Sequence, residues 1–222
     1  MMAGNGNGGR VLWLIRHGMR EDFVDAGWRE RASRPHDPPL AAQGVQQARE
    51  TAAFLAKEGV EVIYTSPFLR TVQTAGELAK RLGCAIRVEH GLTETLKSAW
   101  FPDRPTYVDP VVLVKEYPGI DLRYVPKVEP DYPEEDEDAD TGPRCLRMVR
   151  EVEKDAWGCA VLISHGAAVG QTAKALLGGS ADGICCAMCG VNRFEQGADG
   201  VWRLTLAGTD HLSWSEHAMR FH

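Results

Sequence analysis

Two apolar runs that both end in His-Gly constrain the fold of this chain most strongly. VLWLIRHG occupies residues 11–18, and CAVLISHG occupies residues 159–166. Uninterrupted apolar runs of this length are typical of strands that are buried on both faces, as in a parallel sheet covered by helices. The runs therefore predict two buried strands that carry His17 and His165 just past their carboxyl ends, which is the edge where α/β sheets bind ligands.

Strand and helix patterns alternate along the rest of the chain. Val45, Ala48, Ala52 and Leu55 are spaced by three and four residues, which predicts an amphipathic helix. Elements are expected at 11–15 (strand), 40–58 (helix), 60–65 (strand), 67–82 (helix), 145–155 (helix), 159–164 (strand), 166–177 (helix), and 184–194 with 201–206 (antiparallel strands). This order predicts the α/β class, as a three-layer α/β/α sandwich with a mostly parallel central sheet flanked by helices.

The length of 222 residues is compatible with one α/β domain. We expect a disordered, Gly/Asn-rich tail at 1–9 and a single domain at 10–222. Residues 92–143 show little periodicity, which predicts a long excursion from the sheet that acts as a lid. Within this excursion, EPDYPEEDEDAD at 129–140 holds eight acids and is interpreted as a solvated loop, with a tethered interaction element as the alternative.

The charge and the cysteines exclude some classes of protein. The net charge is −6, and the acidity is concentrated in 129–140. Because Lys and Arg are not clustered, no nucleic-acid-binding face is expected. No apolar run is long enough for a signal peptide or a membrane span, so the six cysteines are interpreted as reduced thiols of a cytoplasmic or nuclear protein. Cys186 and Cys189 form C-x-x-C, but a zinc site needs a second pair, and ICCAMC is interpreted as a buried strand.

A third segment, SPFLRTVQTA at 66–75, adds a cation to the same edge of the sheet. A helix is expected to begin at Ser66-Pro67, with Ser66 as its cap and Pro67 in its first turn. Arg70 is expected one turn into this helix, where it opposes the helix dipole, and this placement indicates an anion nearby. Arg16, Arg20 and Arg70, together with the two histidines, predict a phosphate pocket, because a guanidinium group binds phosphate oxygens in bidentate fashion.

Other interpretations of these residues are open. Each histidine alone could cap its strand through hydrogen bonds, and Arg20 could form a solvated salt bridge. The matched positions of His17 and His165 favour the pocket. Gly18 and Gly166 are interpreted as glycines that let the backbone approach a ligand closely.

Four motifs now stand in order along the chain: RHG at 16–18, SPFLRTVQTA at 66–75, GLTE at 91–94 and SHG at 164–166. Together they resemble the histidine phosphatase superfamily, in the branch that includes the phosphoglycerate mutases. The resemblance is closer to the phosphatase domains of the suppressors of T-cell receptor signalling, which hydrolyse phosphotyrosine, and it extends from residue 10 to about residue 214. The residues that carry this closer match are Arg20, DPPL at 37–40, AWFP at 99–102 and VWRLT at 201–205.

The resemblance implies a phosphoglycerate mutase-like fold with the excursion over the carboxyl edge of the sheet. It implies that His17 attacks phosphorus and forms a phosphohistidine that water hydrolyses. Arg16, Arg70 and His165 would hold the phosphate oxygens, without a metal or a cofactor. A homodimer is implied only by resemblance, and the expected partner is a phosphomonoester, either a phosphoprotein or a small molecule.

The resemblance also implies that Glu94 protonates the leaving oxygen. A carboxyl group beside a dianionic phosphate is driven toward its protonated form, which suits this role. An exposed loop glutamate without a role is the alternative, and Glu89 is the competing candidate for the acid. Arg20 is implied to contact substrate.

The expected activity is a metal-independent phosphomonoesterase for phosphotyrosine, aryl phosphates or small organic phosphates. A cofactor-dependent mutase is disfavoured because MRED follows RHG and TLKSAW follows the acid, where mutases resemble S-x-W-N and R-x-Y-G. A binding module without turnover is disfavoured because binding needs no nucleophile. Ala41 departs from the family pattern, which has a capping Thr after DPPL.

Overall fold

A mixed sheet of six strands forms the centre of the molecule. The structure is a computed structural model that describes residues 9–215, so most of the expected tail at 1–9 lies outside the described residues. The strands are β1 (Val11–Arg16), β2 (Val62–Thr65), β3 (Ala85–Val88), β4 (Cys159–Ser164), β5 (Val191–Gln196) and β6 (Trp202–Gly208). Their order in the sheet is β3-β2-β4-β1-β5-β6. The first four strands run parallel to one another, β5 runs antiparallel to β1, and β6 runs antiparallel to β5.

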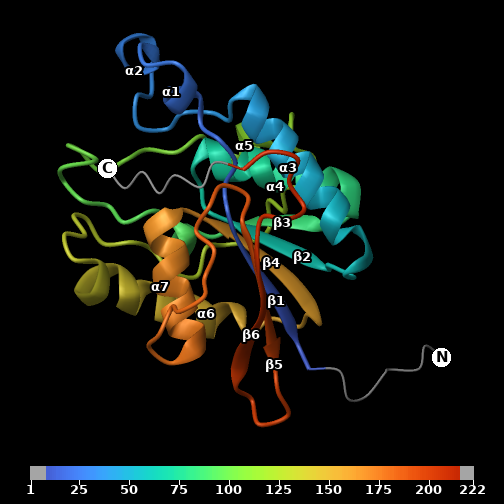
Figure 1. Ribbon diagram of the computed structural model, residues 1–222. Helices are drawn as coiled ribbons and strands as arrows, with labels where there is room; N and C mark the ends of the chain where they lie inside the picture. The colour runs from blue at the N-terminus through green and yellow to red at the C-terminus, as the bar shows by residue number, and fades with distance from the viewer. Residues whose placement is uncertain (1–8, 216–222) are drawn as a thin grey trace.

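Helices cover both faces of this sheet, as Figure 1 shows. The α-helices are α1 (Glu21–Val24), α2 (Trp28–Arg31), α3 (Ala42–Phe54), α4 (Leu69–Leu82), α5 (Pro110–Leu113), α6 (Gly142–Val152) and α7 (Gly166–Leu177). Two short segments are 3₁₀-helices, η1 (Leu55–Lys57) and η2 (His90–Leu92), and one is a π-helix, η3 (Glu137–Thr141). Helices α3 and α4 pack together on one face, and α6 and α7 pack together on the other. The predicted three-layer α/β/α class is confirmed.

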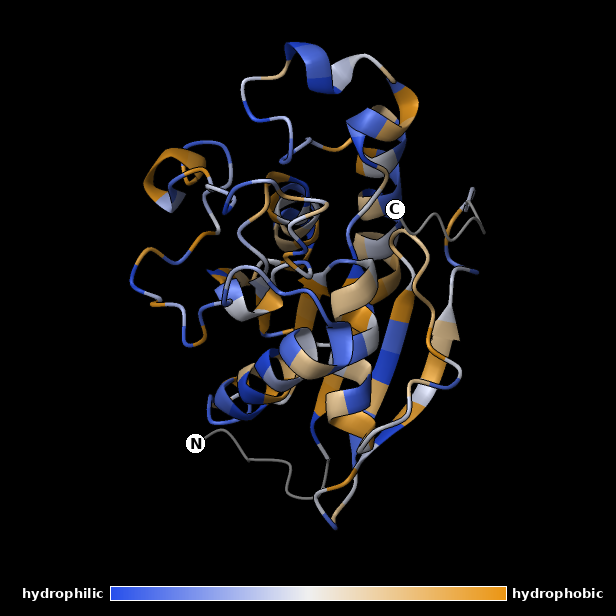
Figure 2. Ribbon diagram, turned by 90° about the vertical axis from the view of Figure 1, so that its left-hand side faces the viewer, coloured by the Kyte–Doolittle hydropathy of each residue, from blue (hydrophilic) through white to orange (hydrophobic). Residues whose placement is uncertain are grey.

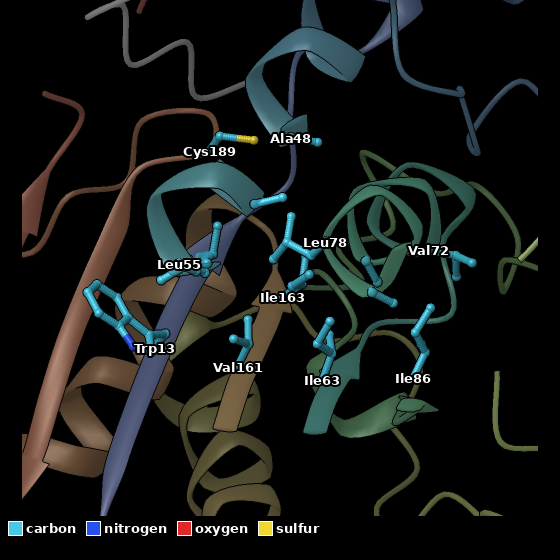
Figure 3. Packing of buried hydrophobic residues seen from close by; sticks show 14 of the residues in the cluster. Trp13, Ala48, Leu55, Ile63, Val72, Leu78, Ile86, Val161, Ile163 and Cys189 are labelled. Atoms are coloured by element: carbon cyan, nitrogen blue, oxygen red, sulfur yellow. The ribbon is translucent and has the colours of Figure 1, made fainter. Parts of the chain in front are cut away.

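Strand β1 shows why the sheet is covered on both sides. Trp13 and Ile15 point into the cluster under α3 and α4, where Leu55 is also fully buried (Figure 3). Leu12 and Leu14 alternate with them and pack into the second cluster, under α6 and α7. Figure 2 shows the corresponding colouring, with hydrophobic stretches on the strands and both hydrophobic and hydrophilic residues along the flanking helices. Burying a strand on both faces requires the uninterrupted apolar run seen in the sequence.

Helix positions agree with the expected ones to within a few residues. The helix expected at 40–58 is α3 followed by η1, and the one expected at 145–155 is α6, which begins three residues earlier. Helix α4 begins at Leu69 rather than at 67, because Ser66 and Pro67 remain in the connection from β2. Strand β3 was not among the expected elements.

The strand expected at 184–194 is wrong over its first half. Residues 184–190 lie in turns and coil, and β5 begins only at Val191. Their backbone groups are satisfied outside a ladder: the Asn192 side chain bonds both the N–H (2.7 Å) and the carbonyl (2.9 Å) of Cys185. The Cys189 N–H donates to the Arg16 carbonyl at 3.0 Å, and Cys189 has a φ of 51°, which no strand residue adopts. Only Met188 and Cys189 of ICCAMC are buried, and the other four residues are partly exposed, so the segment is neither extended nor fully buried.

The excursion at 92–143 leaves the sheet and returns along its edge. Residue Ile120 forms a parallel bridge with Ile86 of β3, so part of the excursion extends the sheet. Another part forms its own apolar cluster around Phe68, Leu96 and Phe101. The excursion is therefore packed against the domain along much of its length.

The acid run at 129–140 is only partly a solvated loop. Glu134 is 1% exposed and forms an ion pair with the equally buried Arg144 of α6. Asp138 at the surface pairs with Lys174 of α7. These contacts attach the run to the helices, which the interpretation as a free solvated loop did not anticipate. The exposed acids around Glu134 still agree with that interpretation.

All six cysteines carry free thiols. Within residues 9–215, none of the helices combines the length and the apolar character that crossing a membrane would require.

Candidate active site

The two predicted histidines lie side by side at the carboxyl edge of the sheet. Strands β1 and β4 are parallel neighbours, with Arg16 opposite Ser164, so the residues that follow them meet. The His17 N–H donates to the Ser164 carbonyl at 3.0 Å, and the centroids of the two imidazole rings are 5.2 Å apart. Both side chains are almost completely buried, His17 at 1% and His165 at 0% exposure.

The hydrogen bonds of His17 leave one ring nitrogen free to react. Its Nδ1 lies 2.7 Å from the carbonyl oxygen of Gly18. Because a carbonyl oxygen can only accept, Nδ1 carries the proton and Nε2 carries the lone pair. Burial, and then the positive charges of Arg70 and Arg16, lower the pKa of His17 well below its ordinary value. His17 is therefore a neutral imidazole at pH 7, with Nε2 available as a nucleophile.

His165 has both ring nitrogens engaged. Arg70 donates from Nη2 to Nδ1 at 3.1 Å, and since an arginine only donates, the His165 proton is on Nε2. Nε2 then donates to the Ser66 hydroxyl at 2.8 Å. Burial and the charge of Arg70 lower the pKa of His165 well below its ordinary value. In this structure His165 thus orients Arg70, rather than presenting its own N–H to a phosphate.

Ser66 was expected only as a helix cap. It lies just past the end of β2, which neighbours β4, and its side chain supports His165. The signal that could have found it is the same one that selected the histidines, namely a polar residue directly after a strand of the parallel sheet.

Arg16 and Arg70 bring unpaired donors to the site. Arg70 is 2% exposed, and Arg16 donates from Nη1 to the Cys186 carbonyl at 2.9 Å. In the described part of the chain, Nε of both arginines and Nη1 of Arg70 have no hydrogen-bond partner. Burial, followed by the charge of Arg20, lowers the pKa of Arg70 to about 9, which leaves it cationic at neutral pH. Buried cations with free donors are suited to bind an anion.

Asp37 lies behind Arg70 and was not predicted as a site residue, although DPPL was noted as a motif. Its Oδ1 accepts from the Leu69 N–H at 2.7 Å and lies 3.9 Å from Arg70 Nη1. It therefore supplies the N-terminal cap of α4 that Ser66 was expected to provide. Burial raises the pKa of Asp37, and the charge of Arg70 opposes that shift.

Arg20 lies at the cavity but is already paired. It forms a two-point ion pair with Asp22, in which Nε donates to Oδ1 at 2.8 Å, and its guanidinium lies 4.4 Å from the centroid of the Phe23 ring. Its side chain is 17% exposed. Arg20 therefore forms an ion pair, as the alternative interpretation expected, although the pair is largely shielded from solvent, and a contact with substrate would compete with Asp22.

A cavity of about 440 Å³ adjoins this group of residues, and the buried His17 and His165 are not among the residues that line it. Arg16, Arg70 and Glu94 line it together with residues 99–102 of the excursion. Four of its lining residues have aromatic rings, namely Phe23, His36, Trp100 and Phe101. This volume is within the range of small-molecule sites, which are mostly apolar with a few polar groups.

Glu94 and Glu89 have different surroundings. Glu94 lines the cavity, and its Oε1 accepts from the N–H of Thr95 at 3.0 Å and of Ala168 at 3.4 Å. Glu89 is fully buried and accepts four hydrogen bonds, from Tyr124 and from the backbone of residues 91, 127 and 128. Glu89 anchors the excursion to β3, so of the two candidates Glu94 is the one at the cavity.

The interpretation of Gly18 is wrong. A Cβ at residue 18 would lie 2.6 Å from the carbonyl oxygen of Gly44 in α3, not in the cavity. A Cβ at Gly166 would lie 3.4 Å from Arg16 Cζ, so this glycine does border a pocket residue. Gly18 lets α3 approach β1, whereas Gly166 gives space to the pocket arginine.

The described residues contain no group of three or more His, Cys, Asp or Glu side chains placed to hold a metal ion.

Comparisons with known proteins place the chain in a family. The sequence model of the histidine phosphatase superfamily (branch 1) matches residues 12–209. The ubiquitin-associated and SH3 domain-containing protein A of Mus musculus is 30% identical over 167 residues, which are 64% of this chain and 24% of that protein. Ecdysteroid-phosphate phosphatase of Bombyx mori is 28% identical over 201 residues, which are 75% of this chain and 30% of that protein. The chain thus spans between about a quarter and a third of the length of these relatives.

The fold agrees with the same assignment. The crystal structure of the Bombyx mori ecdysone phosphate phosphatase in complex with tungstate superposes with a TM-score of 0.74 at 23% identity, and the match covers 96% of this chain and 98% of the other. A mycobacterial glucosyl-3-phosphoglycerate phosphatase gives a TM-score of 0.62 over 89% of this chain and 98% of the other, also at 23% identity. From the match over residues 12–209, this chain belongs to the histidine phosphatase superfamily.

Proposed function

We propose that this chain is a phosphomonoesterase that works through a phosphohistidine at His17. The observation that carries the proposal is a buried, neutral His17 whose Nε2 lone pair is free, beside the buried Arg70 and the half-buried Arg16, both with unpaired N–H groups. A phosphate ester needs both a nucleophile and positive charge around its oxygens. These groups supply both.

The reaction has two steps. First, His17 Nε2 attacks phosphorus, the bond from phosphorus to the ester oxygen breaks, and the leaving oxygen takes a proton from the carboxylic acid of Glu94. Second, a water molecule gives a proton to the Glu94 carboxylate and attacks phosphorus, which releases inorganic phosphate and restores His17. Arg16 and Arg70 stabilise the charge on the phosphoryl oxygens in both steps. The positive charge comes from the arginines, so we propose that turnover needs no metal.

The walls of the cavity favour an aromatic or flat apolar leaving group. Phe23, His36, Trp100 and Phe101 are among the residues that line the cavity. Rings of this kind stack on an aromatic substrate. We therefore place aryl phosphates and phosphotyrosine first among the substrates. Relatives named for ecdysteroid phosphate and for glucosyl-3-phosphoglycerate support organic phosphates as the broader class.

The test is turnover of four substrates by the wild type and by His17→Ala, with and without a metal chelator. The substrates are p-nitrophenyl phosphate, a phosphotyrosine peptide, a phosphoserine peptide and a sugar phosphate. The wild type should hydrolyse the first two best, with or without chelator, and His17→Ala should lose at least about 1,000-fold, as removal of a nucleophile does. His90→Ala is the matched control, because His90 pairs with Glu129 outside the cavity.

Two outcomes would replace the proposal. Tight binding of vanadate by a wild type that turns over none of the substrates would indicate a binding module. Conversion of 3-phosphoglycerate to its isomer, stimulated by a bisphosphorylated cofactor, would indicate a mutase; the relatives named as phosphoglycerate mutases match only 33% of this chain.

A further inference from the structure

A buried arginine contacts the segment that carries Glu94 at several points. Arg144, in the first turn of α6, is 1% exposed and lies beneath residues 91–94. Its Nη1 donates to the carbonyls of Gly91 at 2.7 Å and Thr93 at 2.9 Å, and its Nη2 donates to the carbonyl of Glu94 itself at 3.3 Å. Three backbone carbonyls on the loop of the acid thus converge on one guanidinium.

Glu134 of the excursion completes the arrangement. Its two carboxylate oxygens accept from Arg144, Oε1 from Nε at 2.6 Å and Oε2 from Nη2 at 2.8 Å. All five N–H groups of the guanidinium are therefore used. Glu134 also bonds the far side of the loop, where its Oε2 accepts from the Leu96 N–H at 3.2 Å and its own N–H donates to the Leu96 carbonyl at 2.9 Å.

The carboxylate of Glu94 depends on this backbone for its place. Among the described residues, it accepts a short hydrogen bond from the adjacent Thr95 N–H and a longer one from Ala168. The Ser164 hydroxyl of β4 donates to the Leu92 carbonyl at 2.7 Å, which attaches the start of the loop to the sheet. Arg144 and Glu134 add contacts to the chain on both sides of Glu94.

Stability alone is a weak reason for burying this pair. Removing two charges from water costs several kcal/mol per ion, and apolar residues of similar volume often serve stability as well or better. A buried pair whose bonds run to one functional loop is instead suited to fix a geometry, and proton transfer is sensitive to displacements of well under 1 Å.

We propose that the Arg144–Glu134 pair positions Glu94 for protonation of the leaving oxygen, and so couples the excursion to the chemical step. This inference rests on the proposed phosphatase function. Arg144 and Glu134 are positioning residues, since neither lines the cavity.

The test compares kcat/KM for phenyl phosphate, a poor leaving group, with kcat/KM for p-nitrophenyl phosphate, which needs little protonation. Arg144→Lys keeps the charge but loses the planar fork. It should lower kcat/KM about tenfold or more for phenyl phosphate and less than about threefold for p-nitrophenyl phosphate. Vanadate affinity should stay unchanged, because the phosphate pocket is intact. Glu134→Gln should change the two kcat/KM values in the same way as Arg144→Lys. In a double variant with Glu94→Gln, Arg144→Lys should cause little further loss of kcat/KM for phenyl phosphate.

Two further variants keep the test decisive. Arg87→Lys is the matched control, because Arg87 pairs with Asp155 away from the cavity, and both substrates should keep the wild-type rate. The double variant Arg144→Met/Glu134→Leu removes both charges at once, which proteins tolerate better than removing one, so it provides a folded variant should the single ones unfold.

The inference is overturned if folded variants slow both substrates equally, if their losses multiply with that of Glu94→Gln, or if the double variant keeps the wild-type ratio. A wild type that hydrolyses neither substrate would instead contradict the proposed function.

Discussion

At the scale of single residues, Gly18, which follows the proposed nucleophile His17, has a structural role. Gly18 and Gly44 pack backbone to backbone, and the Gly18 N–H donates to the Thr74 hydroxyl of α4 at 3.2 Å. The Met19 N–H donates to Gln47 of α3 at 2.9 Å. The turn after His17 is thus attached to two helices, and these attachments hold the carbonyl of Gly18 that orients the His17 ring.

We expect Gly18→Ala to destabilise the protein and to misplace His17. The added Cβ would meet the backbone of Gly44 at 2.6 Å, and backbone cannot rotate away as a side chain can, so a loss of about 1–3 kcal/mol in the free energy of unfolding is expected. Gly170→Ala is the control, since a Cβ there meets nothing within 4 Å in the interior of α7, and it should gain about 0.5–1 kcal/mol. Denaturant unfolding measures both, and an unchanged stability for Gly18→Ala would contradict the packing argument.

At the scale of elements, the two helices that pack beside the candidate site begin in different ways. Helix α4, which carries Arg70, receives its cap from the distant Asp37. Helix α3 begins at Ala42, and its N-cap residue Ala41 has an extended backbone (φ −71°, ψ 167°) and a side chain without an acceptor. The first turn of α3, which packs against the turn after His17, therefore lacks the stabilisation that a capping side chain would give.

Ala41→Ser should strengthen this start. A serine fits the space of alanine closely, and its hydroxyl can accept from one of the free N–H groups in the first turn, so the free energy of unfolding should rise by about 1 kcal/mol. Ala42→Ser, one residue later and exposed, places the same hydroxyl inside the helix and should change stability by less than about 0.5 kcal/mol. Thermal unfolding of the two variants distinguishes a capping effect from a general effect of serine; equal changes would rule out the cap.

At the scale of the whole molecule, local sequence patterns predicted most of the sheet and the edge at which the candidate site lies. The features that they did not predict depend on contacts between residues far apart in the sequence. The His-Gly runs predicted β1 and β4 and the proximity of His17 to His165. This was possible because a strand buried on both faces has apolar residues at consecutive positions. Strand β3 was not predicted, because it is only four residues long and its apolar pattern is interrupted by Arg87. The support of Arg70 by Asp37 joins residues far apart in sequence, and no periodicity predicts such a contact.

The excursion was also predicted only in part. The lack of periodicity at 92–143 predicted that this segment leaves the sheet, but it did not predict which contacts attach the segment to the domain. Glu89 bonds the backbone of 127 and 128, and Glu134 bonds Arg144, so two buried carboxylates fix it to the domain. Composition favours a solvated surface for an acid run, and only the buried partner in α6 reverses this for one acid among eight.

The buried histidine pair should also make the stability of the molecule depend on pH. Burial and the nearby arginines lower the pKa of His17 and His165 in the folded protein, whereas in the unfolded chain both titrate near the ordinary value of about 6.5. Below that pH the unfolded state therefore binds more protons, so the free energy of unfolding should fall as the pH decreases from about 6.5 toward the lowered values. Each histidine contributes a slope of up to about 1.4 kcal/mol per pH unit.

His165→Gln isolates one of these contributions. His36 and His211 also have a lowered pKa, so the wild type alone cannot assign the slope, but the difference between wild type and variant can. Denaturant unfolding between pH 5 and 7.5 should show a variant whose stability falls less steeply, by up to about 1.4 kcal/mol per pH unit, with no difference in slope above about pH 7. Parallel curves over the whole range would mean that His165 keeps an ordinary pKa, and the neutral, Arg70-bound imidazole would then be wrong.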